Sequence, residues 1–400
     1  MKFAHISDVH IGSWRDPKMR DVSTRTFSLA VDTCIKESIN FLLIAGDLFD
    51  TALPGIDLLK EVTSKLKELK DHSIPVYLIA GSHDFSPSGK TMLDVLENAG
   101  LCRNVAKGEE IEGKLKLQFT VDPNTSAKIT GIFGKKGMLD HYYYEHLLRG
   151  PLEEEPGYKI FMFHTAIAEF KPKDLQQMEA HPLSLLPKNF DYYAGGHVHY
   201  IEEFSSPGYK RIVYPGALYP CNFAELQKYS HGYLHIIEND AIRKIPLKLY
   251  DCIHIVLDLP HCTPQQITNK ITTELQTRKI KDAITTLHIA GSLDEGKVSD
   301  INFSQIYSSL YDQGAYMVMK NTSKLISKEF EDIQLPKQEN FEDALIKEHL
   351  GKMPFVKGEE EFMMIKNLIA SLSIEKKEGE KIQEFELRVK EVAKLLLKLE

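Results

Sequence analysis

Asp and His residues of the types that bind divalent cations occur in five short segments of the 400-residue chain. The segments are Asp8-Val9-His10, Gly46-Asp47, Ser82-His83-Asp84, His164 and His197-Val198-His199. Carboxylates offset the charge of a cation, imidazoles fix its geometry, and a carboxylate can bridge two cations about 3.5 to 4 Å apart. Such a pair polarises a phosphate and lowers the pKa of a bound water, while a free histidine can protonate the leaving oxygen. The residue types therefore indicate metal-assisted hydrolysis of a phosphoester.

Each segment follows an apolar run that predicts a β-strand. The runs are Phe3 to Ile6, Phe41 to Ala45, Val76 to Ala80, Lys159 to Phe163 and Tyr192 to Ala194. Apolar residues at helical spacing, including Phe27, Ala30 and Cys34, lie between the first two runs and predict an amphipathic helix packed on a sheet. Side chains at the carboxyl ends of strands project into a common crevice, so distant segments can converge. One such motif alone is a weak indicator, but the five together predict a metal site.

Taken together, the motifs resemble the signature of the calcineurin-like metallophosphoesterases. They are Asp8-x-His10, Gly46-Asp47-Leu48-Phe49-Asp50, Gly81-Ser82-His83-Asp84, His164 and Gly196-His197-Val198-His199. Within that superfamily, the opening His5-Ile6-Ser7-Asp8-Val9-His10-Ile11-Gly12 and the box at Gly46 resemble the meiotic-recombination-eleven/SbcD nucleases. The motifs cover the N-terminal half of the chain. The resemblance implies an α/β fold, with a four-layer α/β/β/α sandwich over residues 1–240.

The resemblance also implies a role for each motif residue. One cation would be held by Asp8, His10, Asp47 and His199, and Asp47 would bridge to a second cation held by Ser82, His164 and His197. His83 would bind no metal and would assist the leaving group. Members of this family typically use manganese to cut DNA, degrading it from 3′ ends and nicking single strands.

Two positions depart from the family pattern. Ser82 stands where the family commonly has an Asn that supplies an amide oxygen to the second cation. A neutral hydroxyl is a poorer ligand, so weaker or water-mediated binding of that cation is expected. Asp50 stands where some relatives have a histidine near the scissile phosphate, which leaves the balance between exonuclease and endonuclease activity open.

The second half of the chain predicts two further parts. Residues 241–330 contain strand patterns at His254 to Leu257, Thr286 to Ala290 and Tyr316 to Lys320, and a helix from Phe303 to Tyr311. A further helix is expected to begin after the N-cap Thr263, with proline at its first position. By the resemblance, this small α/β unit would be a capping domain that orients DNA.

Residues 331–400 are charged and helical in pattern, and their last stretch carries a heptad seam. An amphipathic helix must bury its apolar stripe against its own protein or against a partner helix. The resemblance implies an SMC-like coiled-coil ATPase as partner, with packing within the chain as the alternative. The predicted contact residues are Phe385, Val389, Val392 and Leu396.

Basic residues after the first motif are candidates for contacts with DNA phosphates, although ordinary solvated surface is an equal alternative. They are Arg15, Lys18, Arg20 and Arg25. Two further helices are expected, one over Leu58 to Leu69 and one around Met92 to Leu96, and their apolar positions, including Leu59, Val62 and Leu93, are typical of a core. Relatives dimerise through a helical bundle in this region, so the resemblance also implies a homodimer.

The bulk composition sets limits on these interpretations. A formal net charge of −8 argues against wrapping nucleic acid by global electrostatics, but it does not exclude a local basic surface or bound cations. Five cysteines without close pairs favour a reducing cytoplasm over a disulfide framework or a zinc site. No apolar run reaches the length of a membrane span, and no targeting segment is expected.

The sequence is thus interpreted as a nuclease of DNA double-strand-break repair, with 3′-5′ exonuclease and single-strand endonuclease activity and two divalent cations, Mn²⁺ being favoured. Single- and double-stranded DNA ends and the ATPase would be its partners. A phosphatase or cyclic-nucleotide phosphodiesterase on the same metal core is one alternative. The other is a scaffold for DNA ends whose catalysis is weakened by Ser82.

Overall fold

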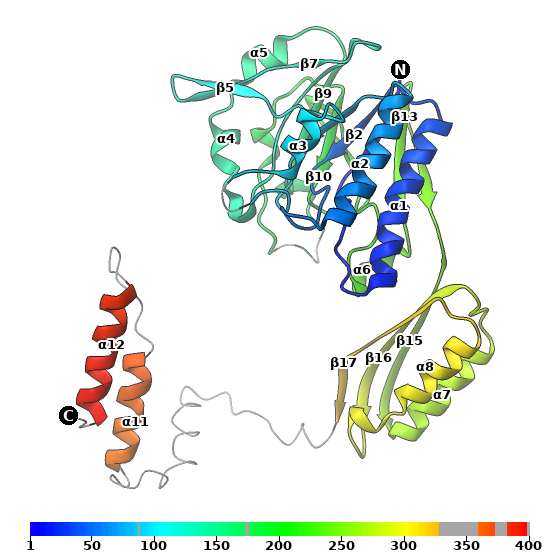
Figure 1. The fold of residues 1–400 in the computed structure, drawn as a ribbon, viewed down its shortest axis with the longest axis vertical. Helices are drawn as coiled ribbons and strands as arrows, with labels where there is room; N and C mark the ends of the chain where they lie inside the picture. The colour runs from blue at the N-terminus through cyan, green and yellow to red at the C-terminus, as the bar shows by residue number, and fades with distance from the viewer. Residues whose placement is uncertain (87–88, 173–174, 176, 328–358, 373–381, 398–400) are drawn as a thin grey trace. The chain divides into compact units, whose positions relative to one another are not determined.

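The computed structural model of the chain describes residues 1–86, 89–172, 175, 177–327, 359–372 and 382–397. They belong to two compact units, Met1–Leu325 and Ile326–Glu400, which are considered separately. Figure 1 shows the elements of both units.

The first unit contains a six-stranded sheet in the order β14-β13-β1-β2-β3-β4. β1, β2, β3 and β4 are parallel, whereas β13 and β14 are antiparallel to their neighbours. All five residues of β2 are buried, as expected for a strand that is covered on both faces. The bounds are β1 Lys2–Ile6, β2 Phe41–Ala45, β3 Val76–Ile79, β4 Arg103–Asn104, β13 Gly232–Glu238 and β14 Ala241–Leu247.

A second six-stranded sheet has the order β11-β12-β10-β9-β8-β7. Its central strands β8, β9, β10 and β12 are parallel. The bounds are β7 Thr120–Val121, β8 Lys128–Ile132, β9 Lys159–His164, β10 Tyr192–Gly196, β11 Glu202–Ser206 and β12 Tyr209–Tyr214. A separate hairpin joins β5 Gly108–Ile111 and β6 Lys114–Leu117.

The two sheets face each other across a buried layer that includes Phe3 and Phe41 of the first sheet and Met162 and Tyr192 of the second. The outer face of the first sheet is covered by α1 Pro17–Lys36, α2 Ile56–Asp71 and α3 Met92–Asn98. α4 His141–Glu145, α5 Arg149–Glu154 and the short helix η4 Leu183–Leu185 contribute side chains to the core on the other sheet's outer face. The predicted four-layer α/β/β/α arrangement is confirmed (Figure 1).

A smaller sheet in the order β15-β16-β17 has its own hydrophobic core. We call these strands and their two helices the β15–β17 unit; its elements are β15 Asp251–Cys262, α7 Pro264–Gln276, β16 Ala283–Leu293, α8 Phe303–Asp312 and β17 Met317–Ser327. Thr263 forms the expected N-cap and, with Gln266, a capping box. The strands are longer than predicted because polar residues occupy many of their exposed positions.

The domain boundaries at residues 240 and 330 stay predictions. The first sheet continues through β14 to Leu247, and the first compact unit ends at Leu325.

The second unit contains α11 Glu359–Leu372 and α12 Ile382–Leu397, which contact each other. On α12, Phe385 and Val389 are half-buried and Val392 is 37% exposed. The side chain of Leu396 lies outside the described residues. Packing of α12 on α11 therefore buries part of the predicted apolar stripe. Binding of this stripe to an SMC-like ATPase stays a prediction.

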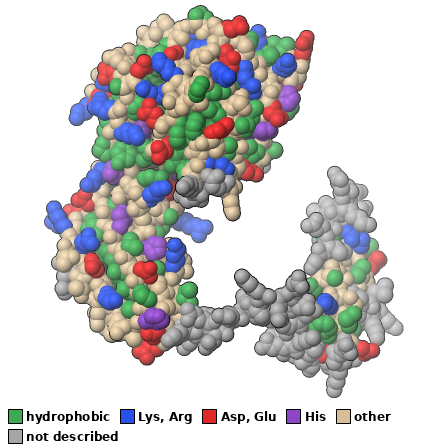
Figure 2. Space-filling model, turned by 180° about the vertical axis from the view of Figure 1, so that it is seen from behind, with side chains coloured by type: hydrophobic (Ala, Val, Ile, Leu, Met, Phe, Trp, Pro, Cys, Tyr) green, Lys and Arg blue, Asp and Glu red, His purple; other side chains and the backbone are tan. Residues whose placement is uncertain are grey.

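The charged residues of the surface are mixed in sign. Figure 2 shows Lys and Arg side chains interspersed with Asp and Glu on the face that it draws. Over the part of the chain that the structure covers, no helix is both long and apolar enough to cross a membrane.

Candidate metal centre

The carboxyl ends of β1, β2 and β10 bring three of the predicted motifs together. The Asp8 backbone N–H donates to the Gly46 carbonyl at 3.2 Å, and the His10 N–H donates to the Asp47 carbonyl at 3.0 Å. The His197 N–H donates to the Asp8 carboxylate at 3.0 Å, joining residues 189 positions apart. The two sheets therefore contribute to one site, as the strand-end argument predicts.

Four of the predicted ligands have left-handed backbone conformations. The φ angles are 49° at Asp8, 45° at His10, 51° at Asp47 and 83° at His197. Such conformations are uncommon for residues with a side chain, cost of order 1–3 kcal/mol each and cluster at functional sites. The surrounding fold thus holds the backbone of these four residues in strained conformations.

His164 and His10 are each oriented by a hydrogen bond on Nδ1. Nδ1 of His164 donates to the Ala45 carbonyl at 2.8 Å, which leaves Nε2 3.1 Å from Asp47 Oδ2. Nδ1 of His10 lies 3.2 Å from Asp50 Oδ1, and its Nε2 lies 3.7 Å from Asp47 Oδ2. His10 Nε2 is buried and has no hydrogen-bond partner among the described residues. An orphaned imidazole nitrogen beside a carboxylate is the arrangement that a cation would complete.

His199 is oriented in the same way by Glu225. Its Nδ1 lies 3.0 Å from Glu225 Oε1, and its Nε2 lies 3.8 Å from Asp8 Oδ1. Glu225 is fixed in turn by the backbone N–H of Cys221, at 2.8 Å, and by the side chain of Asn222. Carboxylate–histidine pairs of this kind fix the tautomer of a metal-binding imidazole.

The site contains a pocket with a volume of about 250 Å³. Ser82, His83 and His197 are among the residues that line it. Ser82 Oγ lies 3.5 Å from Asp47 Oδ2, and the ring centroids of His197 and His164 are 5.3 Å apart. Nδ1 of His83 donates to the Asp50 carbonyl at 2.8 Å, and His83 also offers a ligand atom within 4.8 Å of ligand atoms of His10 and Asp50. The other lining residues are His10, Ser13, Asp47, Asp50, His199 and Cys221.

Asp84 connects the loops that follow β2 and β3. Its carboxylate accepts the backbone N–H groups of Gly81 at 2.9 Å, Phe49 at 3.2 Å and Leu48 at 3.4 Å. Burial, together with the charge of Asp47, raises the pKa of Asp84 to about 7. Asp84 therefore fixes the backbone of Leu48 and Phe49, directly after Asp47, and it is not among the residues that line the pocket.

The charges of the site perturb one another strongly. Burial lowers the pKa of His164, but the charge and hydrogen bond of Asp47 outweigh it and raise that pKa to about 10. Burial also lowers the pKa of His199, but the hydrogen bond to Glu225 and the nearby carboxylates outweigh it and raise that pKa to about 9. Burial and the neighbouring His164 lower the pKa of His197 to about 4. A cation would have to displace protons from His164 and His199, so its binding would strengthen as the pH rises.

The donor set fits divalent cations. Asp8, His10 and His199 offer ligand atoms that lie within 4.8 Å of one another, and so do Asp8, Asp47 and His164. Carboxylate and imidazole ligands suit manganese as well as zinc and iron. His197 belongs to neither group, although its backbone N–H contacts Asp8.

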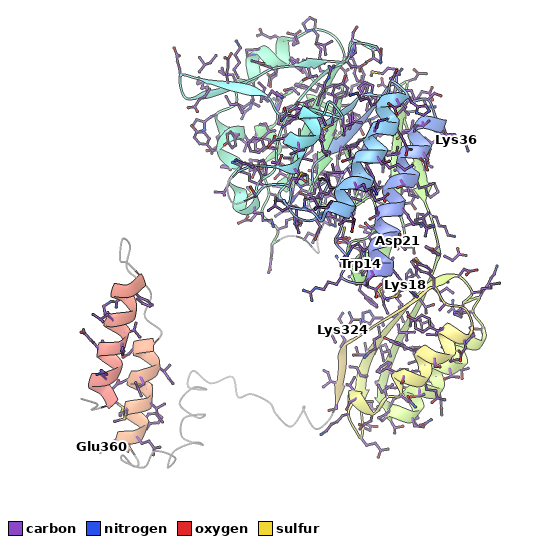
Figure 3. The ribbon with its side chains drawn as sticks, in the orientation of Figure 1. Trp14, Lys18, Asp21, Lys36, Lys324 and Glu360 are labelled. Carbon is purple, nitrogen blue, oxygen red and sulfur yellow. The ribbon has the colours of Figure 1, made fainter. Side chains whose placement is uncertain are left out.

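The four basic residues predicted to contact DNA lie just before α1 or in its first half, and two of them contact residues next to β15 and β17. Lys18 Nζ donates to the Tyr316 carbonyl at 3.2 Å, and Arg25 donates to the Tyr250 hydroxyl at 2.8 Å. Arg20 donates to the carbonyls of Trp14 and Arg15. Figure 3 shows Trp14 and Lys18 at this end of α1 and Lys36 at the other end. Lys18, Arg20 and Arg25 thus have contacts within the first unit, and DNA binding by the four residues stays a prediction.

Two residues beside the pocket were not predicted. Glu225 orients His199, and Cys221 lines the pocket in front of it. Neither follows a strand, so a search of strand ends passes over them. The Asn222-x-x-Glu225 spacing, which caps the short helix α6 Phe223–Tyr229, was the available signal.

A four-layer α/β/β/α sandwich that gathers carboxylates and imidazoles in one pocket defines the class of metal-dependent phosphoesterases. The family described as Calcineurin-like phosphoesterase matches residues 1–200, half of the chain. The chain belongs to this family.

Relatives named "DNA double-strand break repair protein Mre11" come from several archaea. The protein of Archaeoglobus fulgidus is 28% identical over 262 residues, which cover 61% of this chain and 56% of the relative. That of Sulfolobus acidocaldarius is 32% identical over 206 residues, 50% of each chain. That of Methanopyrus kandleri is 27% identical over 235 residues, 57% of this chain and 51% of the relative. The chain therefore spans about half the length of the curated relatives it matches.

Proposed function

We propose that the protein is a nuclease of DNA double-strand-break repair that hydrolyses phosphodiester bonds with two divalent cations. The observation that carries this proposal is the orientation of three histidines. His10, His164 and His199 each have Nδ1 held by an acceptor and Nε2 turned toward Asp8 or Asp47. Family membership supports hydrolysis of phosphoesters, and the names of the archaeal relatives support DNA as the substrate.

In this proposal, Asp8, His10, Asp47 and His199 would hold one cation. His164, His197 and Ser82 would hold a second, with Asp47 shared between the two. The cations, with Mn²⁺ favoured, would supply charge compensation for the phosphate and an activated water. Glu225 and Asp50 act through the imidazoles that they orient. The left-handed conformations at Asp8 and Asp47 persist only because the surrounding fold enforces them, so both carboxylates would be positioned before a substrate arrives.

His83 is the proposed proton donor to the leaving oxygen. Because its Nδ1 donates to the Asp50 carbonyl, Nε2 is the nitrogen that remains for the substrate. His83 lines the pocket and its side chain is 35% exposed, so a phosphodiester can reach it. A protonated imidazole there would donate Nε2–H to the departing 3′-oxygen, leaving a 3′-hydroxyl and a 5′-phosphate.

The first test is His83→Ala. Loss of the proton donor should lower Mn²⁺-dependent cleavage of single-stranded and duplex DNA by about 10²- to 10⁴-fold. Mn²⁺ binding, measured by titration calorimetry, should change little because His83 is not a ligand. His72→Ala, at the exposed C-terminus of α2, is the matched control and should behave as the wild type.

Full DNA cleavage by His83→Ala would contradict the assigned role. A wild-type protein that hydrolyses small phosphoesters but leaves DNA intact in Mn²⁺, Mg²⁺ and chelator would favour a phosphatase or cyclic-nucleotide phosphodiesterase instead. A protein that binds DNA without cleaving it would favour a scaffold.

Further parts of the proposal rest on the archaeal relatives and on the family resemblance. The β15–β17 unit would act as a DNA-orienting cap, the region after residue 330 would bind an SMC-like coiled-coil ATPase, and the chain would form a homodimer. Cleavage from 3′ ends, nicking of single strands and a cytoplasmic location complete it. Five free cysteines are compatible with a reducing compartment.

A further inference from the structure

Beside the proposed metal centre lies a second group of side chains that could hold a metal ion, and it differs from the first in containing sulfur. His199, Cys221 and Glu225, here called the Cys221 cluster, offer a nitrogen, a sulfur and an oxygen within 4.8 Å of one another. Cys221 is a free cysteine that is partly exposed and lines the same pocket as His199. None of the residues assigned to the two proposed cations, other than His199, belongs to this cluster.

We propose that the Cys221 cluster binds a thiophilic divalent cation, of which Zn²⁺ is the representative, and that this binding withdraws His199 from the neighbouring centre. Thiolate ligands select zinc and similar metals, whereas manganese and magnesium prefer oxygen ligands. The cluster would therefore favour zinc over the Mn²⁺ proposed for the neighbouring centre because it adds a sulfur ligand. This inference rests on the proposed use of His199 by that centre.

The geometry requires only small shifts of side chains. Zinc bonds of about 2.3 Å to sulfur and about 2.0 to 2.2 Å to nitrogen and oxygen place tetrahedral ligands about 3.3 to 3.8 Å apart. Nδ1 of His199 and Oε1 of Glu225 are already 3.0 Å apart, and the sulfur must approach them from within 4.8 Å. The Cys221 thiol now donates a weak hydrogen bond to the Tyr219 carbonyl at 3.4 Å. Rotation about the single Cα–Cβ bond of Cys221 would break this contact and turn the sulfur toward the other two ligands. Water would supply the fourth ligand.

The two uses of His199 exclude each other because a neutral imidazole has a single lone pair. When Nδ1–H donates to Glu225, the lone pair is on Nε2, which faces Asp8 and the proposed centre. When Nδ1 binds zinc, the proton moves to Nε2 through solvent, and Nε2 can no longer act as a ligand. The Cys221 thiol loses its own proton to solvent on binding. Zinc and the proposed first cation should therefore weaken each other's binding reciprocally.

Cobalt provides a direct test on the full chain. Co²⁺ replaces zinc and gives a thiolate-to-metal charge-transfer absorbance only when sulfur is bound. We expect this absorbance in the wild type and its loss in Cys221→Ser, and we expect added Mn²⁺ to diminish it in the wild type. Cys252→Ser, at another partly exposed free cysteine, is the control and should retain the absorbance.

A second measurement follows zinc itself. Zn²⁺ affinity is measured by competition with a chromophoric chelator and should fall at least about tenfold in Cys221→Ser. Removing a residue that only hydrogen-bonds a metal ligand already costs about tenfold in affinity, and Cys221 would bind the metal directly. Zn²⁺ should also inhibit Mn²⁺-supported hydrolysis of bis-p-nitrophenyl phosphate in the wild type, at concentrations that leave Cys221→Ser uninhibited.

Equal charge-transfer absorbance, or equal zinc affinity, in the wild type and Cys221→Ser would overturn the inference. So would an absorbance that Mn²⁺ does not change. Neither binding measurement requires DNA cleavage. Zinc binding by the Cys221 cluster could therefore be judged even if the protein proved not to be a nuclease.

Discussion

Close backbone approach at single residues decides whether the metal centre can form. Gly46 has a φ of +86°, and a Cβ there would lie 2.2 Å from Nδ1 of His164. A Cβ on Gly196 would lie 2.0 Å from the Ala45 carbonyl oxygen, which is the acceptor for the same imidazole. Both glycines thus allow His164 to sit against the ends of β2 and β10 with its Nε2 toward Asp47. Their role is steric, and it explains why glycine precedes the ligand in each motif.

Gly46→Ala should therefore damage the centre without changing any ligand. The left-handed φ and the clash with His164 should cost more than about 2 kcal/mol of unfolding free energy. Mn²⁺ affinity should fall at least about tenfold because His164 moves. Urea unfolding and calorimetric titration measure the two effects.

Gly55→Ala is the control, since its Cβ would meet nothing within 4 Å and its φ is −59°. Wild-type Mn²⁺ affinity in Gly46→Ala would show that His164 does not depend on this contact.

At the scale of elements, the sequence predicts the buried strands well and the half-exposed ones less well. The strand Phe41–Ala45 has the predicted bounds. A strand that is buried on both faces is apolar at every position, so an uninterrupted apolar run marks its full length. The strand predicted at His254 to Leu257 instead extends over Asp251–Cys262, since polar residues on its exposed face break the apolar pattern. The convergence of candidate ligands such as Asp8, Asp47 and His164 could be predicted from their places at strand ends. The contact of Glu225 with His199 could not, because it depends on how α6 is placed.

The junction between α1 and the β15–β17 unit gives a prediction about Lys18. Besides its bond to the Tyr316 carbonyl, Lys18 Nζ lies 5.5 Å from the ring centroid of Tyr311 and 5.6 Å from that of Tyr316. Exposed cation–π contacts contribute about 0.5–1 kcal/mol, so Lys18→Ala should speed amide hydrogen exchange at the start of β17 by about two- to fivefold. Hydrogen exchange read by mass spectrometry measures this.

Lys36→Ala, exposed near the other end of the same helix, should leave the exchange unchanged (Figure 3). DNA affinity measured across salt concentrations separates the two readings of Lys18. A phosphate contact would reduce the salt slope by about 1, whereas a purely structural residue would leave the slope unaltered. Unchanged exchange in Lys18→Ala would remove the structural role.

At the scale of the whole molecule, the two sheets of the sandwich are joined by polar as well as apolar contacts. His5 on β1 shares a hydrogen bond of 2.9 Å with the Tyr192 hydroxyl on β10. His5 and His235 are paired across β1 and β13, and both are buried. His5 Nε2 and both ring nitrogens of His235 have no hydrogen-bond partner in the described part of the chain. These imidazoles can be accommodated only while they are uncharged.

Acid should therefore unfold the protein through this pair. Burial, and the neighbouring Lys244, lower the pKa of His235 to about 3, and burial together with His235 lowers the pKa of His5. Since the unfolded chain takes up protons below a pH of about 6.5 and the folded chain does not, stability is retained above that pH and falls as the pH drops toward 3. The loss is at most about 1.4 kcal/mol per pH unit for each histidine.

Urea titrations from pH 7 to 4 measure this dependence. In His235→Gln, the slope of the unfolding free energy against pH should be shallower than in the wild type by up to that amount. His261→Gln, at a histidine whose side chain is 72% exposed, should parallel the wild type. Because the difference between variants cancels the titration of the metal centre, equal slopes for His235→Gln and the wild type would exclude His235 as a source of acid sensitivity.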